Sequence, residues 1–199
     1  MHPRGAVFDA VRDRTGSVPP WGVPWLDEPA RDDVVVRMSR GTGLPSPLPD
    51  LLGLAIRVPG DGGPVDLLLT STGRGAATRL LPVPRRDAAT AYSSIMGYRS
   101  DAGVLRLSAA PDGPDAPSEP EPLAHAVLRE GLGFALLAAR GSGPWRPFGR
   151  LTVAVPRDPL DCDIRFDAVL NPPPGLVPDG PIARLRAPAY ARARAAGRH

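Results

Sequence analysis

Leu51–Val58 reads LLGLAIRV and Pro64–Thr70 reads PVDLLLT, and these two apolar runs decide the fold class. Pro59–Gly63 separates them and contains the Gly and Asp residues that favour a tight turn. A turn this short joins antiparallel strands. The stretch therefore predicts an antiparallel β-hairpin.

Similar short runs recur on both sides of this hairpin. Asp33–Ser39 (DVVVRMS) is rich in the β-branched residues that favour strands. The other predicted strands are Ala6–Arg12, Gly103–Ala109, Gly133–Ala139, Arg150–Val155 and Asp161–Ala168. About eight short strands with Gly and Pro at their corners are typical of a closed barrel or a sandwich.

Three segments have helical character. Asp87–Gly97 begins with a possible cap and has apolar residues at helical spacing. Leu123–Glu130 and the Ala- and Arg-rich Ile182–Ala196 are the other two predicted helices. We expect loops at 21–29, 41–49 and 111–122, so the fold class is α+β and mainly β.

Composition limits the possible partners. The 199 residues suit one domain spanning 1–199, and all 24 basic residues are Arg. The net charge is only +3, and no basic cluster alternates with aromatic residues, so we expect no nucleic-acid partner.

Cysteine content and hydropathy indicate the compartment. Cys162 is the single cysteine, so an internal disulfide is excluded, and we expect a buried, inert thiol in a strand. The chain has no apolar run of 18–20 residues and no apolar signal region at its start. We therefore expect a cytoplasmic protein without a membrane span.

The C-terminal segment 178–196 places Arg186 four residues before Tyr190. On a helix the two side chains share one face, and a guanidinium beside a phenol favours the phenolate. A phenolate can bind ferric iron, and Tyr is one of the axial ligands of protein-bound haem. The alternative is that Tyr190 only packs this helix against the barrel.

Residues 171–179 (NPPPGLVPD), followed by Arg186 and Tyr190, resemble the end of the haem-binding domain of catalases. Other segments resemble catalase motifs in the same order: residues 1–5 (MHPRG), 36–39 (VRMS), 49–58 (PDLLGLAIRV), 65–68 (VDLL), 149–153 (GRLTV) and 165–167 (RFD). The chain is thus similar to the catalase-like haem-dependent superfamily, as a small, barrel-only member. Allene oxide synthase also belongs to that superfamily.

The resemblance implies a closed antiparallel catalase-like β-barrel with a few flanking helices, a C-terminal helix and bound haem b. Tyr190 would be the iron ligand, and Arg186 would keep it ionised. Arg37 would pair with a haem propionate through a forked, charge-assisted bond. The alternative for Arg37, from the residues alone, is an ion pair with Asp33 or Asp50 at the surface.

On the distal side, the resemblance implies that His2 moves protons to and from peroxide. Ser39 would hold the ring of His2 in one tautomer. Ser71 is the nearest counterpart of a catalase Asn, within Thr70-Ser71-Thr72. A hydroxyl has a shorter reach than an amide, and no Arg precedes His2, so the expected activity is weaker than that of a catalase.

The resulting expectation is weak catalase or peroxidase-like activity on hydrogen peroxide or organic hydroperoxides. One alternative is a non-enzymatic barrel that binds haem or another small ligand. Another is a hydrolase of unrecognised type that uses the mouth of the barrel. The oligomeric state is open, with a homo-oligomer as one option.

Overall fold

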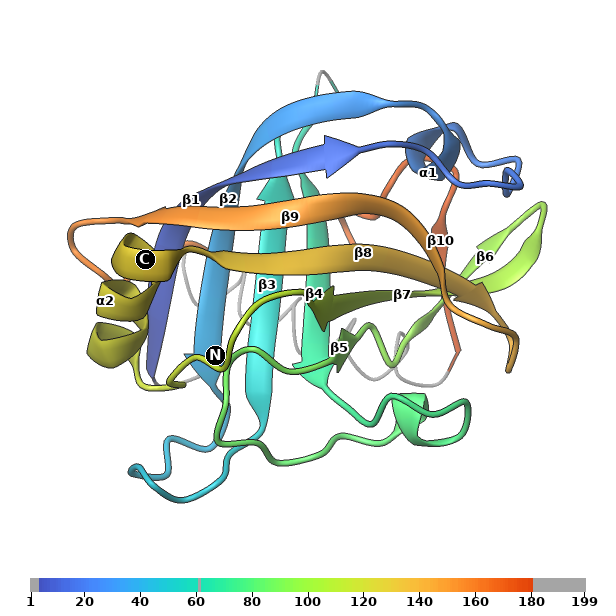
Figure 1. The fold of residues 1–199 in the computed structure, drawn as a ribbon. Coiled ribbons are helices and arrows are strands. Elements are labelled where there is room, and N and C mark those ends of the chain that lie inside the picture. Colours follow the sequence, from blue (N-terminus) through green and yellow to red (C-terminus); the bar gives the residue numbers. More distant parts are fainter. Residues whose placement is uncertain (1–3, 61, 181–199) are drawn as a thin grey trace, which may run out of the picture.

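The computed structural model describes residues 4–60 and 62–180, and in this part of the chain the architecture is mainly β (Figure 1). Eight antiparallel strands close into a barrel in the order β1-β2-β3-β4-β5-β7-β8-β9, with β9 pairing back to β1. The barrel strands are β1 (Arg4–Arg14), β2 (Ala30–Arg40), β3 (Leu52–Val58), β4 (Val65–Ser71), β5 (Tyr92–Ser93), β7 (Gly103–Pro111), β8 (Leu132–Arg140) and β9 (Arg146–Pro156). The predicted closed barrel is confirmed, and β6 (Gly97–Ser100) and β10 (Val177–Asp179) extend it from β7.

Alternation along the strands fills the barrel with apolar side chains. On β2, for example, Val34, Val36 and Met38 face inward and are at most 3% exposed. The matching inward residues of the next two strands are Leu54, Ile56, Val58, Val65, Leu67 and Leu69. The interior is therefore a packed core, and ligands have to bind elsewhere, such as on the outer face of the sheet.

Two short helices pack against the barrel (Figure 1). α1 (Pro24–Asp27) brings Trp25 against Phe148, with ring centroids 5.9 Å apart. α2 (Pro120–Glu130) packs on β1 and β9 and ends at Gly131, whose φ of 71° suits glycine. None of the helices in the described residues is long and apolar enough to cross a membrane.

The helix predicted at Asp87–Gly97 is wrong. This segment forms β5 and the start of β6, and its side chains are buried on several sides instead of along one stripe. The Asp87 carboxylate accepts hydrogen bonds from the N–H groups of Ala89 (2.7 Å) and Ala116 (2.9 Å). Side-chain bonds of this kind compete with the helical pattern.

The strand predicted at Asp161–Ala168 is also wrong, because this segment has no regular structure. Cys162 is half-buried and its Sγ lies 2.9 Å from the carbonyl of Pro159, so the expectation of a buried strand thiol fails. The segment instead bonds to the outer face of the barrel, as described below. The predicted loop at 21–29 contains α1, and the terminal helix 182–196 lies outside the described residues.

Candidate functional site on the outer face of the barrel

The candidate site lies on the outer face of strands β1 to β4. Arg37 and Ser39 alternate with the inward-facing Val36 and Met38, so both face outward. Cross-strand pairing puts Ser39 in one row with Gly5, Gly53 and Thr70. The next row holds Val7, Arg37, Ala55 and Leu68. The result is a strip of short side chains beside one arginine.

Arg37 lies across the start of β1. A Cβ atom built on Gly5 would be only 2.6 Å from Nη2 of Arg37, so the guanidinium depends on a glycine at this position. Its Nε and Nη2 donate to the two carboxylate oxygens of Asp161, both at 2.9 Å. The Arg37 side chain is 12% exposed, which leaves it at the surface yet fixed in direction.

The segment after β9 carries Asp161 to this place. The Arg157 N–H donates to the carbonyl of Val7 (2.8 Å), and the Val7 N–H donates to the carbonyl of Leu160 (2.7 Å). The chain therefore runs beside β1 for a few residues before reaching Arg37. The sequence-based alternatives for Arg37, Asp33 and Asp50, are wrong as partners, because a carboxylate 124 positions away pairs with it.

Asp66 binds a second segment that covers the same outer face, residues 165–171, which we call the covering segment. It is fully buried and accepts from Nε and Nη2 of Arg57, both at 2.7 Å. It also accepts from the Asp167 N–H and from Nδ2 of Asn171, both at 2.8 Å. The hydrogen bond to Asp66 raises the pKa of Arg57, against the effect of partial burial. Residues 165–171 are thereby bound to β3 and β4.

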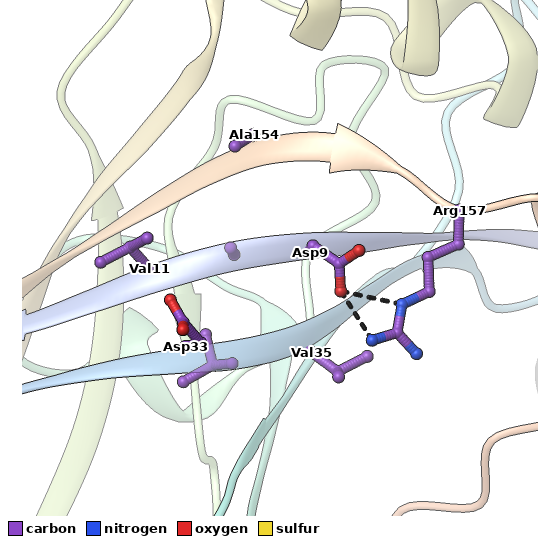
Figure 2. A pocket seen from close by; sticks show the side chains of 8 residues that line it. Asp9, Val11, Asp33, Val35, Ala154 and Arg157 are labelled. Atoms are coloured by element: carbon purple, nitrogen blue, oxygen red, sulfur yellow. Dashed lines mark hydrogen bonds and ion pairs between the residues drawn. The ribbon is translucent and has the colours of Figure 1, made fainter.

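A shallow groove of about 370 Å³ adjoins the site over β1, β2 and β9. Figure 2 shows Val11, Asp33 and Val35 on its walls, with the Arg157 guanidinium bonded to Asp9 at 2.9 and 2.6 Å. Val35 is two residues from Arg37 on the same face of β2, so the groove continues the candidate site along the barrel.

No protein-family model and no curated protein sequence matches the chain. Solved structures do match. Catalase A from Saccharomyces cerevisiae aligns over 96% of this chain with a TM-score of 0.70 and 11% identity. A fungal catalase aligns over 93% (TM-score 0.67, 11% identity) and a bacterial catalase over 94% (TM-score 0.64, 13% identity).

The chain has a catalase-like fold. It spans 59%, 56% and 54% of these three catalases, in the same order, so their whole-protein activity is not carried over by the fold.

Within this catalase-like barrel, Ser71 does not join the outer site. It shares the inward face of β4 with Leu67 and Leu69 and is fully buried. Its hydroxyl accepts from the Leu52 N–H (3.0 Å) and donates to the Val83 carbonyl (2.8 Å). Thr70 is the hydroxyl that shares a row with Ser39. In the sequence, the two-residue alternation along β4 already places Thr70 and Ser71 on opposite faces of the strand.

Three predicted site residues, His2, Arg186 and Tyr190, lie outside the described residues. His2 precedes Gly5 by three positions in the sequence. Among residues 4–60 and 62–180, no group of three His, Cys, Asp or Glu side chains could hold a metal ion. The described part of the site thus offers a forked cation and hydroxyl groups.

Proposed function

We propose that this protein binds haem b on the outer face of β1 to β4 and acts on hydrogen peroxide or organic hydroperoxides, with weak catalase or peroxidase-like activity. The observation that carries the proposal is the placement of Arg37 and Ser39 together on one face of a catalase-like barrel. The two residues are those that the sequence resemblance selects.

The described residues fit such a group. Gly5, Gly53 and Ala55 leave a strip of the sheet with little side chain, which suits a flat ring. Arg37 stands beside this strip, and its planar fork matches a carboxylate. Asp161 occupies that fork in this structure, so a propionate would have to share Arg37 or replace Asp161.

Haem, when bound, supplies the redox chemistry. Tyr190 would hold the iron as a phenolate, and the charge of Arg186 would keep that phenol ionised. His2 would take a proton from the peroxide and return it to the departing oxygen, and Ser39 would fix its tautomer.

We assign the remaining distal hydroxyl to Thr70 instead of Ser71. Thr70 is half-buried on the outer face, whereas both hydrogen-bonding functions of Ser71 are used between backbone groups. A Thr hydroxyl can donate to a bound peroxide, but it is shorter than an amide. This difference supports an activity below that of a full catalase.

The visible absorption spectrum of the protein expressed with haem tests the proposal. We expect a Soret band and the charge-transfer bands of phenolate-bound ferric haem, at one haem per chain. Tyr190→Phe should remove these phenolate features and leave the far-UV circular dichroism unchanged. A folded, colourless protein that does not take up added haem would overturn the haem assignment.

Peroxide turnover separates an enzyme from a binding barrel. His2→Ala should lower the rate by a factor of about 10² or more, the usual contribution of a general acid–base group. His125→Ala is the matched control, because His125 is exposed on α2. Haem binding with equal rates in both variants would favour a non-enzymatic haem barrel.

A further inference from the structure

Beside the second half of the barrel lies a buried arginine that has no carboxylate partner among the described residues. Arg79 belongs to the single-turn helix η1 (Thr78–Leu80) and is 3% exposed. Within residues 4–60 and 62–180, its Nε and Nη1 atoms have no hydrogen-bond partner. Burying a charge without a partner is unfavourable, so such a group calls for an explanation.

A second arginine, Arg106, lies near Arg79, because Ser93, which bonds to the Arg79 carbonyl, pairs across the sheet with Ser108, two residues from Arg106 on β7. Arg106 alternates with the inward-facing Leu105 and Leu107 of β7, so it lies on the outer face, and its buried Nε also lacks a partner in the described part of the chain. Burial and the charge of Arg106 both lower the pKa of Arg79. Since a guanidinium stays protonated in proteins, two positive charges lie near each other here.

An aromatic ring fixes the direction of the first cation. Cζ of Arg79 lies 4.4 Å from the ring centroid of the half-buried Trp145, which precedes β9. A guanidinium over an indole face is held by the cation–π attraction. This contact orients Arg79 without using its N–H donors, and Nε and Nη1 have no other partner in the described residues.

The backbone of Arg79 is held at both ends. Its N–H donates to the Gly75 carbonyl (2.9 Å), and the Ser93 hydroxyl donates to its carbonyl (2.8 Å). The Thr78 hydroxyl accepts from the Gly75 N–H at 3.0 Å and closes the turn. The loop is therefore fixed by bonds that do not involve the guanidinium.

We propose that Arg79 and Arg106 form a binding site for an oxyanion, either a carboxylate or a phosphate group. Arginine forks bind both groups through paired, charge-assisted hydrogen bonds. The chain itself offers little to fill this role, because the only acidic side chain outside the described residues is Asp61. The site does not depend on the haem proposal, since none of its residues belongs to the haem face.

Thermal unfolding of the full chain, without added haem, tests the site. Inorganic phosphate and acetate are titrated separately, and sodium chloride keeps the ionic strength constant. A ligand that binds only the folded state raises the unfolding midpoint with the logarithm of its concentration. We expect a rise of about 5 °C or more near saturation with at least one of the two anions.

Three variants localise the effect. Arg79→Met and Arg106→Met should each weaken the anion affinity by a factor of about ten or more, the loss expected for a charge-assisted bond. Arg129→Met removes an equal charge from an exposed position on α2 and should leave the affinity unchanged. Arg106 is only half-buried, so Arg106→Met tests the site even if Arg79→Met fails to fold.

The responses to the two anions show which chemical class of ligand the site binds. A midpoint that responds to phosphate alone indicates a phosphate ester, and one that responds to acetate alone indicates an organic acid. The proposal is overturned if neither anion raises the midpoint. It is also overturned if Arg106→Met and Arg129→Met respond as strongly as the parent protein, because the effect is then a general one.

Discussion

The arginines on the two halves of the barrel's outer face differ in whether they have a carboxylate partner in the described residues. On the side of β1 to β4, Arg37, Arg57 and Arg157 each pair with a carboxylate of the same chain: Asp161, Asp66 and Asp9, respectively. On the side of β5 to β8, Arg79 and Arg106 pair with none in the described residues, although Arg79 is almost fully buried.

This difference indicates that arginine has two roles in the protein, one structural and one in binding a ligand. A paired arginine fixes a covering segment to the barrel, as Arg57 and Asp66 do for residues 165–171. An unpaired one keeps its donors for something that is not part of the chain. Removing a paired group should therefore weaken the fold, whereas removing an unpaired one should not.

Asp66→Ala should have the largest effect. The change leaves the Asn171 amide, the Asp167 N–H and the Arg57 guanidinium without their common acceptor. Breaking a buried pair from one side costs about 3–5 kcal/mol. Urea unfolding followed by circular dichroism measures the loss.

Asp163→Asn is the control for this prediction. Asp163 is 71% exposed in its side chain and lies 3.9 Å from Arg165, so the loss should stay below about 1 kcal/mol. Equal losses in the two variants would show that Asp66 does not fix the covering segment.

Asp50→Asn should lower the free energy of unfolding by about 1.5–3 kcal/mol at neutral pH, the range for hydrogen bonds to a charged group, and the loss should depend on pH. Burial opposes the charge of Asp50, but hydrogen bonds from the Thr42 hydroxyl and the Thr42 and Leu44 N–H groups lower its pKa below the ordinary value. A lowered folded-state pKa stabilises the fold above the unfolded-state pKa, and this stability is lost as the pH falls through the folded-state pKa.

The free energy of unfolding of the parent and of Asp50→Asn, measured from pH 7 to pH 2, checks the sign. The gap between them should begin to narrow near pH 4, the ordinary pKa of Asp, and continue to narrow below it. A gap that is constant with pH would mean that Asp50 gains no stability from its ionisation.

Arg79→Met should change the free energy of unfolding by no more than about 1 kcal/mol in a buffer free of phosphate and carboxylates. The variant loses the contact with Trp145 but is relieved of a buried charge next to Arg106, and the two effects oppose each other. Chemical denaturation measures the difference. A loss as large as that of Asp66→Ala would mean that Arg79 is a structural residue and would end the contrast between the two halves.

The sequence predicted the barrel well because its strands alternate. DVVVRMS and LLGLAIRV have a two-residue period that assigns each side chain to a face, including Arg37 and Ser39. The failures occurred where backbone groups bond to side chains. Asp87 and Ser93 fix a non-helical path through a segment whose spacing resembles a helix.

Long-range pairs were beyond the reach of the sequence. Nothing near Arg37 indicates that its partner is Asp161, which arrives through hydrogen bonds between Val7 and the segment after β9. The lack of a carboxylate partner for Arg79 among the described residues was equally hidden, because it depends on where the fold places the acidic side chains. By contrast, the choice of Thr70 over Ser71 could have been made from alternation along β4.

Asp161→Asn should give the smallest of these effects. It should raise haem affinity, whereas the earlier substitutions of Asp66 and Asp50 lower the stability of the fold. The amide cannot pair with Arg37 as a charge, so the guanidinium becomes more available to a haem propionate. Partly exposed ion pairs contribute about 0.2–1 kcal/mol, so haem affinity should rise by a factor of about 2–5. Titration of the protein with haem, followed by absorption, gives the affinity, and Asp163→Asn should leave it unchanged. Arg37→Gln should lower the haem affinity. If Asp161→Asn instead lowered haem affinity as Arg37→Gln does, Asp161 would be a support that orients Arg37 toward the haem face, and the pair would act as one unit.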